Sequence, residues 1–169
     1  MQSVVAILDS IARGETTPRK AVEASLDAIA AQDKAVEAFE ALQARDALLA
    51  QADRAKGPLA GIAVGVKDIF DTADLPTTYG SPAYEGYLPR TDAAMVSMMR
   101  GAGAVVAGKT VSTEFAFLNP ARTKNPAAPG HTPGGSSAGS AAASGRRLTA
   151  RCRPHSSAPR RSLRTRAQR

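Results

Sequence analysis

The sequence has a single cysteine, Cys152, among its 169 residues. One cysteine cannot form an internal disulfide or supply a cysteine-based zinc cluster. No apolar run is long enough to span a bilayer, and Met1–Arg13 has no basic residue ahead of an apolar stretch, as a secretory signal would. We therefore predict a cytoplasmic protein with no membrane partner.

Acidic residues and glycines are missing from residues 146–169, which contain nine arginines. Residues 1–145 hold the other 13 basic residues and all 15 acidic residues, a net charge of −2, so the overall +7 comes from the Arg-rich tail. We predict that the tail is disordered. Nonspecific nucleic-acid binding by the tail is one alternative function, but the tail lacks the interleaved aromatic residues that stack on bases, which makes nucleic acid an unlikely partner.

The first third of the chain has the apolar spacing of amphipathic helices. We expect one helix over Ser3–Ala12 and a second that begins at Thr17-Pro18, where threonine can cap the helix and proline fits its first turn. Residues 30–56 are consistent with either one long helix or two helical segments with a break near 32–34. These helices are expected to pack without carrying chemistry.

The next region has the pattern of a strand, a helix and a strand. Ile62, Val64 and Val66 alternate with small residues and then Lys67, which predicts a strand whose last side chain lies on the less crowded face. Residues 70–90 are predicted to form a loop, a helix begins at Thr91 or Asp92, and residues 104–107 form a short buried strand. This order predicts an α/β fold with parallel strands.

The segment Gly103–Thr110 matches the P-loop pattern G-x-x-x-x-G-K-[ST], so nucleotide binding is an alternative function. A P-loop needs a strand before it and a helix after it, whereas a helical stripe precedes this segment. Its interior residues are Ala-Val-Val-Ala, which favour an extended strand over a turn wrapped around phosphate. We therefore favour a buried strand that ends in Gly-Lys-Thr.

A Gly/Ser-rich segment follows a proline-punctuated stretch. A helix can begin within Ser112–Leu118, residues 119–133 are predicted to be irregular, and Gly134-Gly135-Ser136-Ser137 leads into an Ala-rich helix start at 138–143. Together with residues 61–68 and 101–110, this segment resembles the amidase signature family. Thr113-Glu114-Phe115 and Lys124-Asn125-Pro126 also look like that family. The resemblance implies that residues 1–145 are the N-terminal part of an amidase domain, an incomplete mixed sheet flanked by helices.

The resemblance implies a Ser–cis-Ser–Lys catalytic set that cleaves carboxamides through an acyl-enzyme. Lys67 corresponds to the general base, and Ser136 corresponds to the relay serine held by a cis peptide bond. A lysine accepts a proton only when it is neutral, and a hydroxyl can accept and donate at once. We therefore expect Lys67 and Ser136 to lie within hydrogen-bonding distance.

The family's nucleophilic serine is not found where the pattern places it. Arg160 occupies the expected position, and no nearby serine follows a glycine. We expect the chain to be inactive as written. The abrupt change to arginine suggests a shift of reading frame. Translation of the coding DNA in its other two frames tests this hypothesis, which fails if neither frame encodes an apolar strand and a Gly-Ser element.

Within the family, a general amidase is the preferred interpretation, and a component of a transfer-RNA amidotransferase is the alternative. The resemblance implies a small-molecule amide substrate, no cofactor, no metal and a homodimer.

Overall fold

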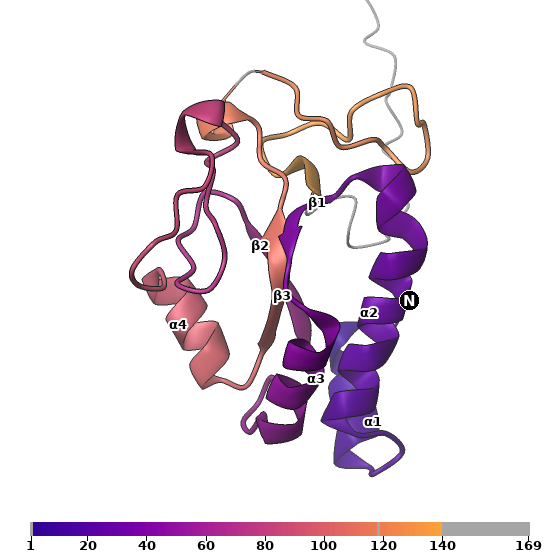
Figure 1. The fold of residues 1–169 in the computed structure, drawn as a ribbon. Helices are drawn as coiled ribbons and strands as arrows, with labels where there is room; N and C mark the ends of the chain where they lie inside the picture. The colour runs from indigo at the N-terminus through magenta and orange to yellow at the C-terminus, as the bar shows by residue number, and fades with distance from the viewer. Residues whose placement is uncertain (1, 118, 140–169) are drawn as a thin grey trace, which may run out of the picture.

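The computed structural model describes residues 2–117 and 119–139, where helices cover both faces of a three-stranded sheet (Figure 1). The strands β1 (Phe39–Leu42), β2 (Ala63–Lys67) and β3 (Val105–Thr110) lie in the order β1–β3–β2. The central strand β3 is antiparallel to β1 and parallel to β2. This arrangement confirms the predicted α/β fold with a mixed sheet.

Two of the predicted helix starts are confirmed. The Ser3 hydroxyl accepts from the backbone N–H of Ala6, and the Thr17 hydroxyl accepts from that of Lys20, so both residues act as N-caps. The α-helices of the described residues are α1 (Val4–Ala12), α2 (Pro18–Val36), α3 (Arg45–Arg54) and α4 (Ala94–Gly101).

Residues 30–56 differ from the prediction of one or two helical segments. Helix α2 continues through 32–34 to Val36, and its C-cap Glu37 has a left-handed φ of 55°. The Asp33 carboxylate accepts the backbone N–H groups of Ala38 (2.7 Å) and Phe39 (3.2 Å), which directs the chain into β1 before α3 begins. The sequence did not predict β1, because this strand is stabilised by pairing with β3, which is distant in the chain. The spacing of apolar residues gives no information about such a distant contact.

The predicted strand–helix–strand unit is present as β2, α4 and β3, with the two strands parallel. Helix α4 is preceded by Ala93 and has no side-chain cap. The expected cap Asp92 instead accepts the backbone N–H of Ala73 (2.8 Å) and pairs with Arg100 (3.0 Å).

The P-loop interpretation of Gly103–Thr110 is wrong. β3 continues past residue 107 to Thr110 and all six of its residues are buried, which confirms the favoured interpretation of a buried strand that ends in Gly-Lys-Thr. Its backbone forms ladders with β1 and β2, so these N–H groups are not free to surround a phosphate.

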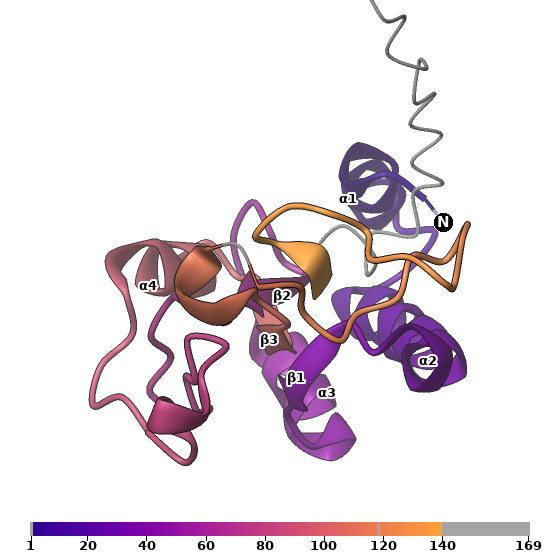
Figure 2. The same cartoon turned by 90° about the horizontal axis from the view of Figure 1, so that it is seen from above.

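Two apolar clusters lie on opposite faces of the sheet. Figure 2 shows α4 on one side of the strands and α2 and α3 on the other. Val105 and Ala107 face the cluster formed with α2 and α3, whereas Val66 and Val106 pack against Val96 of α4. The alternation along β2 and β3 thus builds a core on each face.

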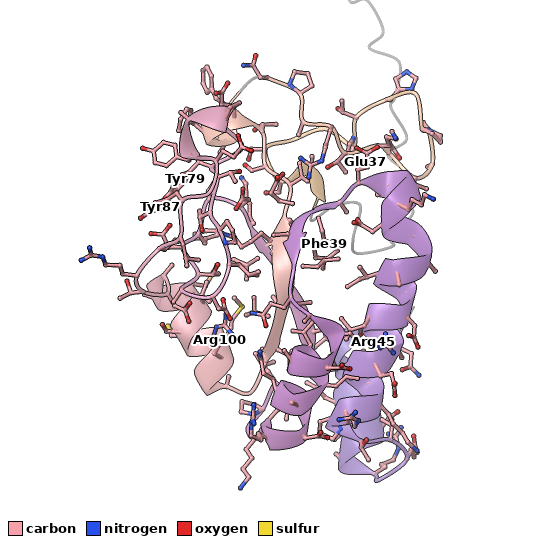
Figure 3. The ribbon with its side chains drawn as sticks, in the orientation of Figure 1. Glu37, Phe39, Arg45, Tyr79, Tyr87 and Arg100 are labelled. Carbon is pink, nitrogen blue, oxygen red and sulfur yellow. The ribbon has the colours of Figure 1, made fainter. Side chains whose placement is uncertain are left out.

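Aromatic rings order the loop between β2 and α4, predicted as the irregular segment 70–90. The ring centroids of Tyr79 and Tyr84 are 4.9 Å apart, and the Tyr79 hydroxyl donates to Asp71 (2.7 Å). This hydrogen bond raises the pKa of Tyr79 to about 12. Figure 3 shows Tyr79 and Tyr87 together on this loop, which also contains a short 3-10 helix, η1 (Pro82–Tyr84).

The segment after β3 is mostly irregular. The helix suggested for residues 112–118 is a single 3-10 turn, η2 (Glu114–Ala116), because Phe115 and Ala116 have φ values of 47° and 59° that end helical propagation. Residues 119–137 of the described chain form no helix or strand, as their prolines predict.

The Arg-rich tail, Arg160 and most of the Ala-rich helix start at 138–143 lie outside the described residues. Within the described ranges, no helix combines the length and apolar character needed to cross a bilayer.

Candidate active site

Lys67 lies at the carboxyl end of β2, on the same side of the strand as Gly65. A β-carbon at Gly65 would lie 2.6 Å from Thr110 Cγ2 and 3.3 Å from the ring of Phe39, so only glycine fits without displacing these groups. Lys67 Nζ donates to Ser136 Oγ at 2.8 Å. The structure therefore brings together two side chains that are 69 positions apart in the sequence.

Ser136 reaches Lys67 from a turn in the Gly/Ser segment. The carbonyl of Ser136 accepts from the Ser112 hydroxyl (3.2 Å) and from the backbone N–H of Thr113 (3.4 Å). Further on, the Gly139 N–H donates to the carbonyl of Val111 (3.1 Å). These bonds hold the Gly/Ser segment along the chain that leaves β3.

Gly139 allows this close approach. A β-carbon there would lie 2.1 Å from the carbonyl oxygen of Ala38 and 2.5 Å from the amide nitrogen of Val111. Both neighbours are backbone atoms and cannot rotate away. The small residue expected in a Gly/Ser-rich loop is therefore a steric requirement for placing Ser136.

The expectation of a cis peptide bond at Ser136 is corrected by the structure. No cis peptide bond occurs within residues 2–117 and 119–139, so Ser136 is held by trans bonds. Gly134 and Gly135 have φ values of 78° and 72°, and these left-handed conformations turn the chain toward Lys67. Two consecutive glycines with left-handed backbone therefore precede Ser136 in place of the expected cis bond.

The surroundings of Lys67 favour a neutral amine. Burial lowers the pKa of Lys67 because the charged form loses hydration. The ion pairs found among the described residues do not include it, and its hydrogen-bond partner is a neutral hydroxyl. An amine in this setting can exchange a proton with Ser136.

A second lysine, Lys109, lies at the end of β3 and has different surroundings. Its ammonium is 3.1 Å from the Asp68 carboxylate, and neither side chain is exposed. Lys109 also donates to the hydroxyl of Thr77, and Asp68 accepts the backbone N–H of Thr78 (3.1 Å). Burial lowers the pKa of Lys109 and Asp68 opposes that shift. The pair joins the ends of β2 and β3 to the loop that follows β2.

Ser136 lines a pocket of about 340 Å³. The wall combines hydroxyl groups and glycine backbone with apolar side chains, and its residues are Thr113, Ala116, Phe117, Pro120, Ala121, Thr132, Gly134, Gly135, Ser136 and Ala138. Sequence reasoning did not single out Thr113 as a site residue, because a threonine that follows a strand carries no distinctive pattern.

Contacts with the end of α2 hold the irregular segment that forms part of this wall. Glu37 makes two of these contacts: its carbonyl accepts from the Thr123 hydroxyl (2.8 Å), and its carboxylate pairs with Lys124. Arg122 pairs with Glu40 (2.7 Å). Figure 3 shows Glu37 at this end of the helix, with Phe39 following on β1. The segment is thus attached to the end of α2 and to β1, an edge strand of the sheet that carries Lys67.

The part of the chain that the structure describes contains no cluster of three or more His, Cys, Asp or Glu side chains that could hold a metal ion.

Comparisons with known proteins assign the chain to a family. Residues 20–150 match the Amidase family. The chain is 41% identical over 157 residues to the A subunit of glutamyl-tRNA(Gln) amidotransferase from Acidothermus cellulolyticus, covering 84% of this chain and 31% of that protein. The corresponding protein of Thermobifida fusca is 41% identical over 152 residues, with 79% and 30% covered. The chain thus spans about a third of the length of the curated relatives that it matches.

Solved structures show the same likeness. The native peptide amidase of Stenotrophomonas maltophilia superposes with a TM-score of 0.74 at 32% identity, over 84% of this chain and 33% of that one. A 6-aminohexanoate cyclic dimer hydrolase gives a TM-score of 0.77 at 28% identity, over 84% and 31%. Because the family match includes most of the chain and these folds agree with it, the chain belongs to the Amidase family.

Proposed function

We propose that Lys67 and Ser136 are the general base and the relay of an amidase site that cleaves the C–N bond of carboxamides. The 2.8 Å contact between Lys67 Nζ and Ser136 Oγ carries this proposal. The lowered pKa of Lys67 supports it, because a neutral amine is the form that accepts a proton.

In the proposed reaction, Ser136 accepts the proton of a serine nucleophile and passes its own proton to Lys67. The nucleophile oxygen attacks the amide carbonyl, and the leaving amine takes the proton back through Ser136 as the C–N bond breaks. Water then attacks the acyl-enzyme by the same proton path and releases the carboxylic acid. Lys67 and Ser136 end each cycle in their starting states.

What we propose about the nucleophile rests on the sequence alone. Arg160 stands at its expected position and lies outside the described residues. We therefore expect no hydrolysis of a simple aryl amide by this chain. Turnover that disappears in Lys67→Ala would contradict that expectation.

A chimera tests the proposed roles directly. Residues 1–139 would replace the matching segment of the Stenotrophomonas maltophilia peptide amidase, which supplies the remainder of the domain. We expect hydrolysis of a peptide amide, with kcat/KM lowered about 10²–10⁴-fold by Lys67→Ala or Ser136→Ala. The control is Lys34→Ala, which removes an exposed lysine near the end of α2. Full activity in Lys67→Ala would refute the assignment.

The chain of 169 residues allows a test without turnover. Competitive acylation of its lysines across a pH series, read by mass spectrometry, reports the ionisation of each amine. We expect the midpoint for Lys67 to lie below the ordinary 10.5 and to change in Ser136→Ala, which removes its hydrogen-bond partner. A midpoint at or above 10.5 would remove the support for a general base.

A second candidate is the role of the A subunit in a glutamyl-tRNA(Gln) amidotransferase, which the 41% identity to the Acidothermus cellulolyticus protein favours. Residues 1–139, placed in that protein instead of its matching segment, test this candidate. Restored amidation of glutamyl-tRNA(Gln), together with an inactive peptide amidase chimera, would favour the amidotransferase role over a free-standing amidase.

A further inference from the structure

The three tyrosines of the sequence and Phe115 form one group of rings, the aromatic cluster, at the surface of the molecule. The Tyr84 ring centroid lies 4.9 Å from that of Tyr79 and 5.9 Å from that of Tyr87. Phe115, from the turn η2, is 6.1 Å from Tyr84. The rings stay accessible, because Tyr84, Tyr87 and Phe115 are 40%, 41% and 56% exposed. Aromatic side chains are enriched at binding surfaces, so this group is a candidate docking surface.

Two carboxylates without a cationic partner border the aromatic cluster in the sequence. Glu85 follows Tyr84, and Glu114 precedes Phe115. The ion pairs found among the described residues include neither carboxylate, so Arg90 on the same loop does not neutralise them. A surface with exposed rings and unpaired carboxylates favours a guanidinium group, which stacks on aromatic faces and pairs with carboxylates.

The chain itself contains a segment with the matching chemistry. The Arg-rich tail, residues 146–169, holds nine arginines and no acidic residue, whereas residues 1–145 have a net charge of −2. The described chain ends at Gly139, shortly after Ser136, which shares a pocket wall with Phe117. Residues 140–169 can extend about 100 Å when stretched, so the tail is long enough to reach the aromatic cluster from this point.

We propose that arginines of the Arg-rich tail bind the aromatic cluster of the same chain. Their guanidinium groups stack on the exposed rings and pair with Glu85 and Glu114. These contacts use arginine side chains alone, so they need no helix or strand in the tail. Attachment to the same chain gives the tail a high effective concentration, which makes weak individual contacts sufficient. The interaction is independent of the proposed proton transfer between Lys67 and Ser136.

A nitroxide spin label on Cys152 of the full chain tests the proposal. Cys152 lies within the Arg-rich tail and is the single cysteine, so labelling needs no substitution. The label broadens the NMR signals of nearby backbone amides. We expect stronger broadening at Tyr84, Tyr87 and Phe115 than in helix α1, which lies away from the loop between β2 and α4 in both views (Figures 1 and 2). About 0.5 M salt should reduce this broadening, because it screens the charges.

Variants of the aromatic cluster separate the contributions of charge and ring. Glu85→Gln combined with Glu114→Gln should lower the relaxation enhancement about two- to fivefold, the effect of losing exposed ion pairs. Tyr84→Leu should lower it by a similar factor, whereas Tyr84→Phe keeps a ring and should stay near the wild type. The matched control, Glu15→Gln with Glu23→Gln, removes two exposed carboxylates on other elements and should have a smaller effect.

Three results would overturn the proposal. One is broadening of helix α1 that equals or exceeds that of the aromatic cluster, and another is broadening that the Glu85→Gln, Glu114→Gln pair leaves unchanged. The third is equal broadening when nitroxide-bearing chains are mixed with isotope-labelled chains that carry no nitroxide, because this would assign the contact to a second copy. If a variant unfolds at a lower temperature than the wild type, the salt series on the wild-type chain still decides, and broadening that salt does not reduce would contradict binding through arginine.

Discussion

Lys67 and Lys109 lie at the ends of adjacent parallel strands, yet they have opposite kinds of environment. Lys109 is fully buried and paired with a carboxylate, whereas Lys67 is partly exposed and contacts a hydroxyl beside a pocket. Burial lowers the pKa of both lysines, and at Lys109 the Asp68 carboxylate opposes that shift, whereas the hydrogen-bond partner of Lys67 is a neutral hydroxyl. The comparison teaches that two lysines on neighbouring strands differ through the groups that folding places beside them, a carboxylate in one case and a hydroxyl in the other.

The register of the sheet creates this difference. Val66 lies opposite Lys109 and Lys67 lies opposite Thr110, so the two lysines project from different faces. The face of Lys109 meets Asp68 and the loop after β2, and the face of Lys67 meets the Gly/Ser segment. Each lysine can therefore be altered separately.

The largest effect is expected from Lys109→Met, which leaves Asp68 buried without its counter-ion. We expect a loss of about 3–5 kcal/mol in the free energy of unfolding, measured by urea denaturation. Adding Asp68→Asn removes the unpaired charge, so the double variant should be more stable than Lys109→Met alone. Wild-type stability in Lys109→Met would show that the pair does not hold the strand ends together.

Gly139→Ala should have the next largest effect, because its new β-carbon would clash with the backbone of Ala38 and Val111. We expect a loss of about 1–3 kcal/mol by the same measurement. Displacement of Ser136 should also raise the acylation rate of Lys67 while Lys109 stays protected. Equal increases in the acylation rates of Lys67 and Lys109 would mean that the two faces of the sheet do not respond independently.

A smaller effect is expected from Lys67→Met, which removes one hydrogen bond at a partly exposed position. The free energy of unfolding should fall by less than about 1 kcal/mol. A loss as large as that of Lys109→Met would assign Lys67 a structural role and remove the contrast between the two lysines.

The smallest expected effect is a pH dependence that belongs to Lys67 alone. Its folded pKa lies below the ordinary value of 10.5, so the unfolded chain binds more protons between these two values. The stability of the wild type, measured relative to Lys67→Met, should therefore rise with pH across this window and fall as pH drops through the folded pKa. Both proteins contain Lys109, so its contribution to the pH dependence cancels in the difference between them. A flat difference would contradict the lowered pKa.

Much of the local structure could be predicted because its causes are local. Ser3 and Thr17 cap helices through bonds to residues three positions away, and the alternation of β2 follows from its own side chains. β1 and the P-loop alternative show the limit of such reasoning. The four residues of β1 follow a helical pattern in the sequence, and only their pairing with the distant β3 makes them a strand. In the same way, the motif Gly-Lys-Thr does not reveal that Lys109 pairs with Asp68.

Some features of the candidate site could be predicted from the sequence and others could not. The Gly/Ser segment and Lys67 could be chosen from residue types and from their resemblance to a family, but the trans backbone at Ser136 and the unpaired hydroxyl of Thr113 could not. Peptide-bond geometry and hydrogen-bond satisfaction depend on what the rest of the chain places nearby.

The sequence by itself determined the first two helix starts and the strand–helix–strand unit, because these depend on spacing and side-chain chemistry, and its resemblance to a family indicated the two residues of the proposed proton path. Only the tertiary structure decided which lysine would be paired with a carboxylate and which would meet a serine 69 positions away. The physical reason is that a pKa, a steric fit or a hydrogen bond is set by neighbours in space, and folding chooses those neighbours from distant parts of the chain.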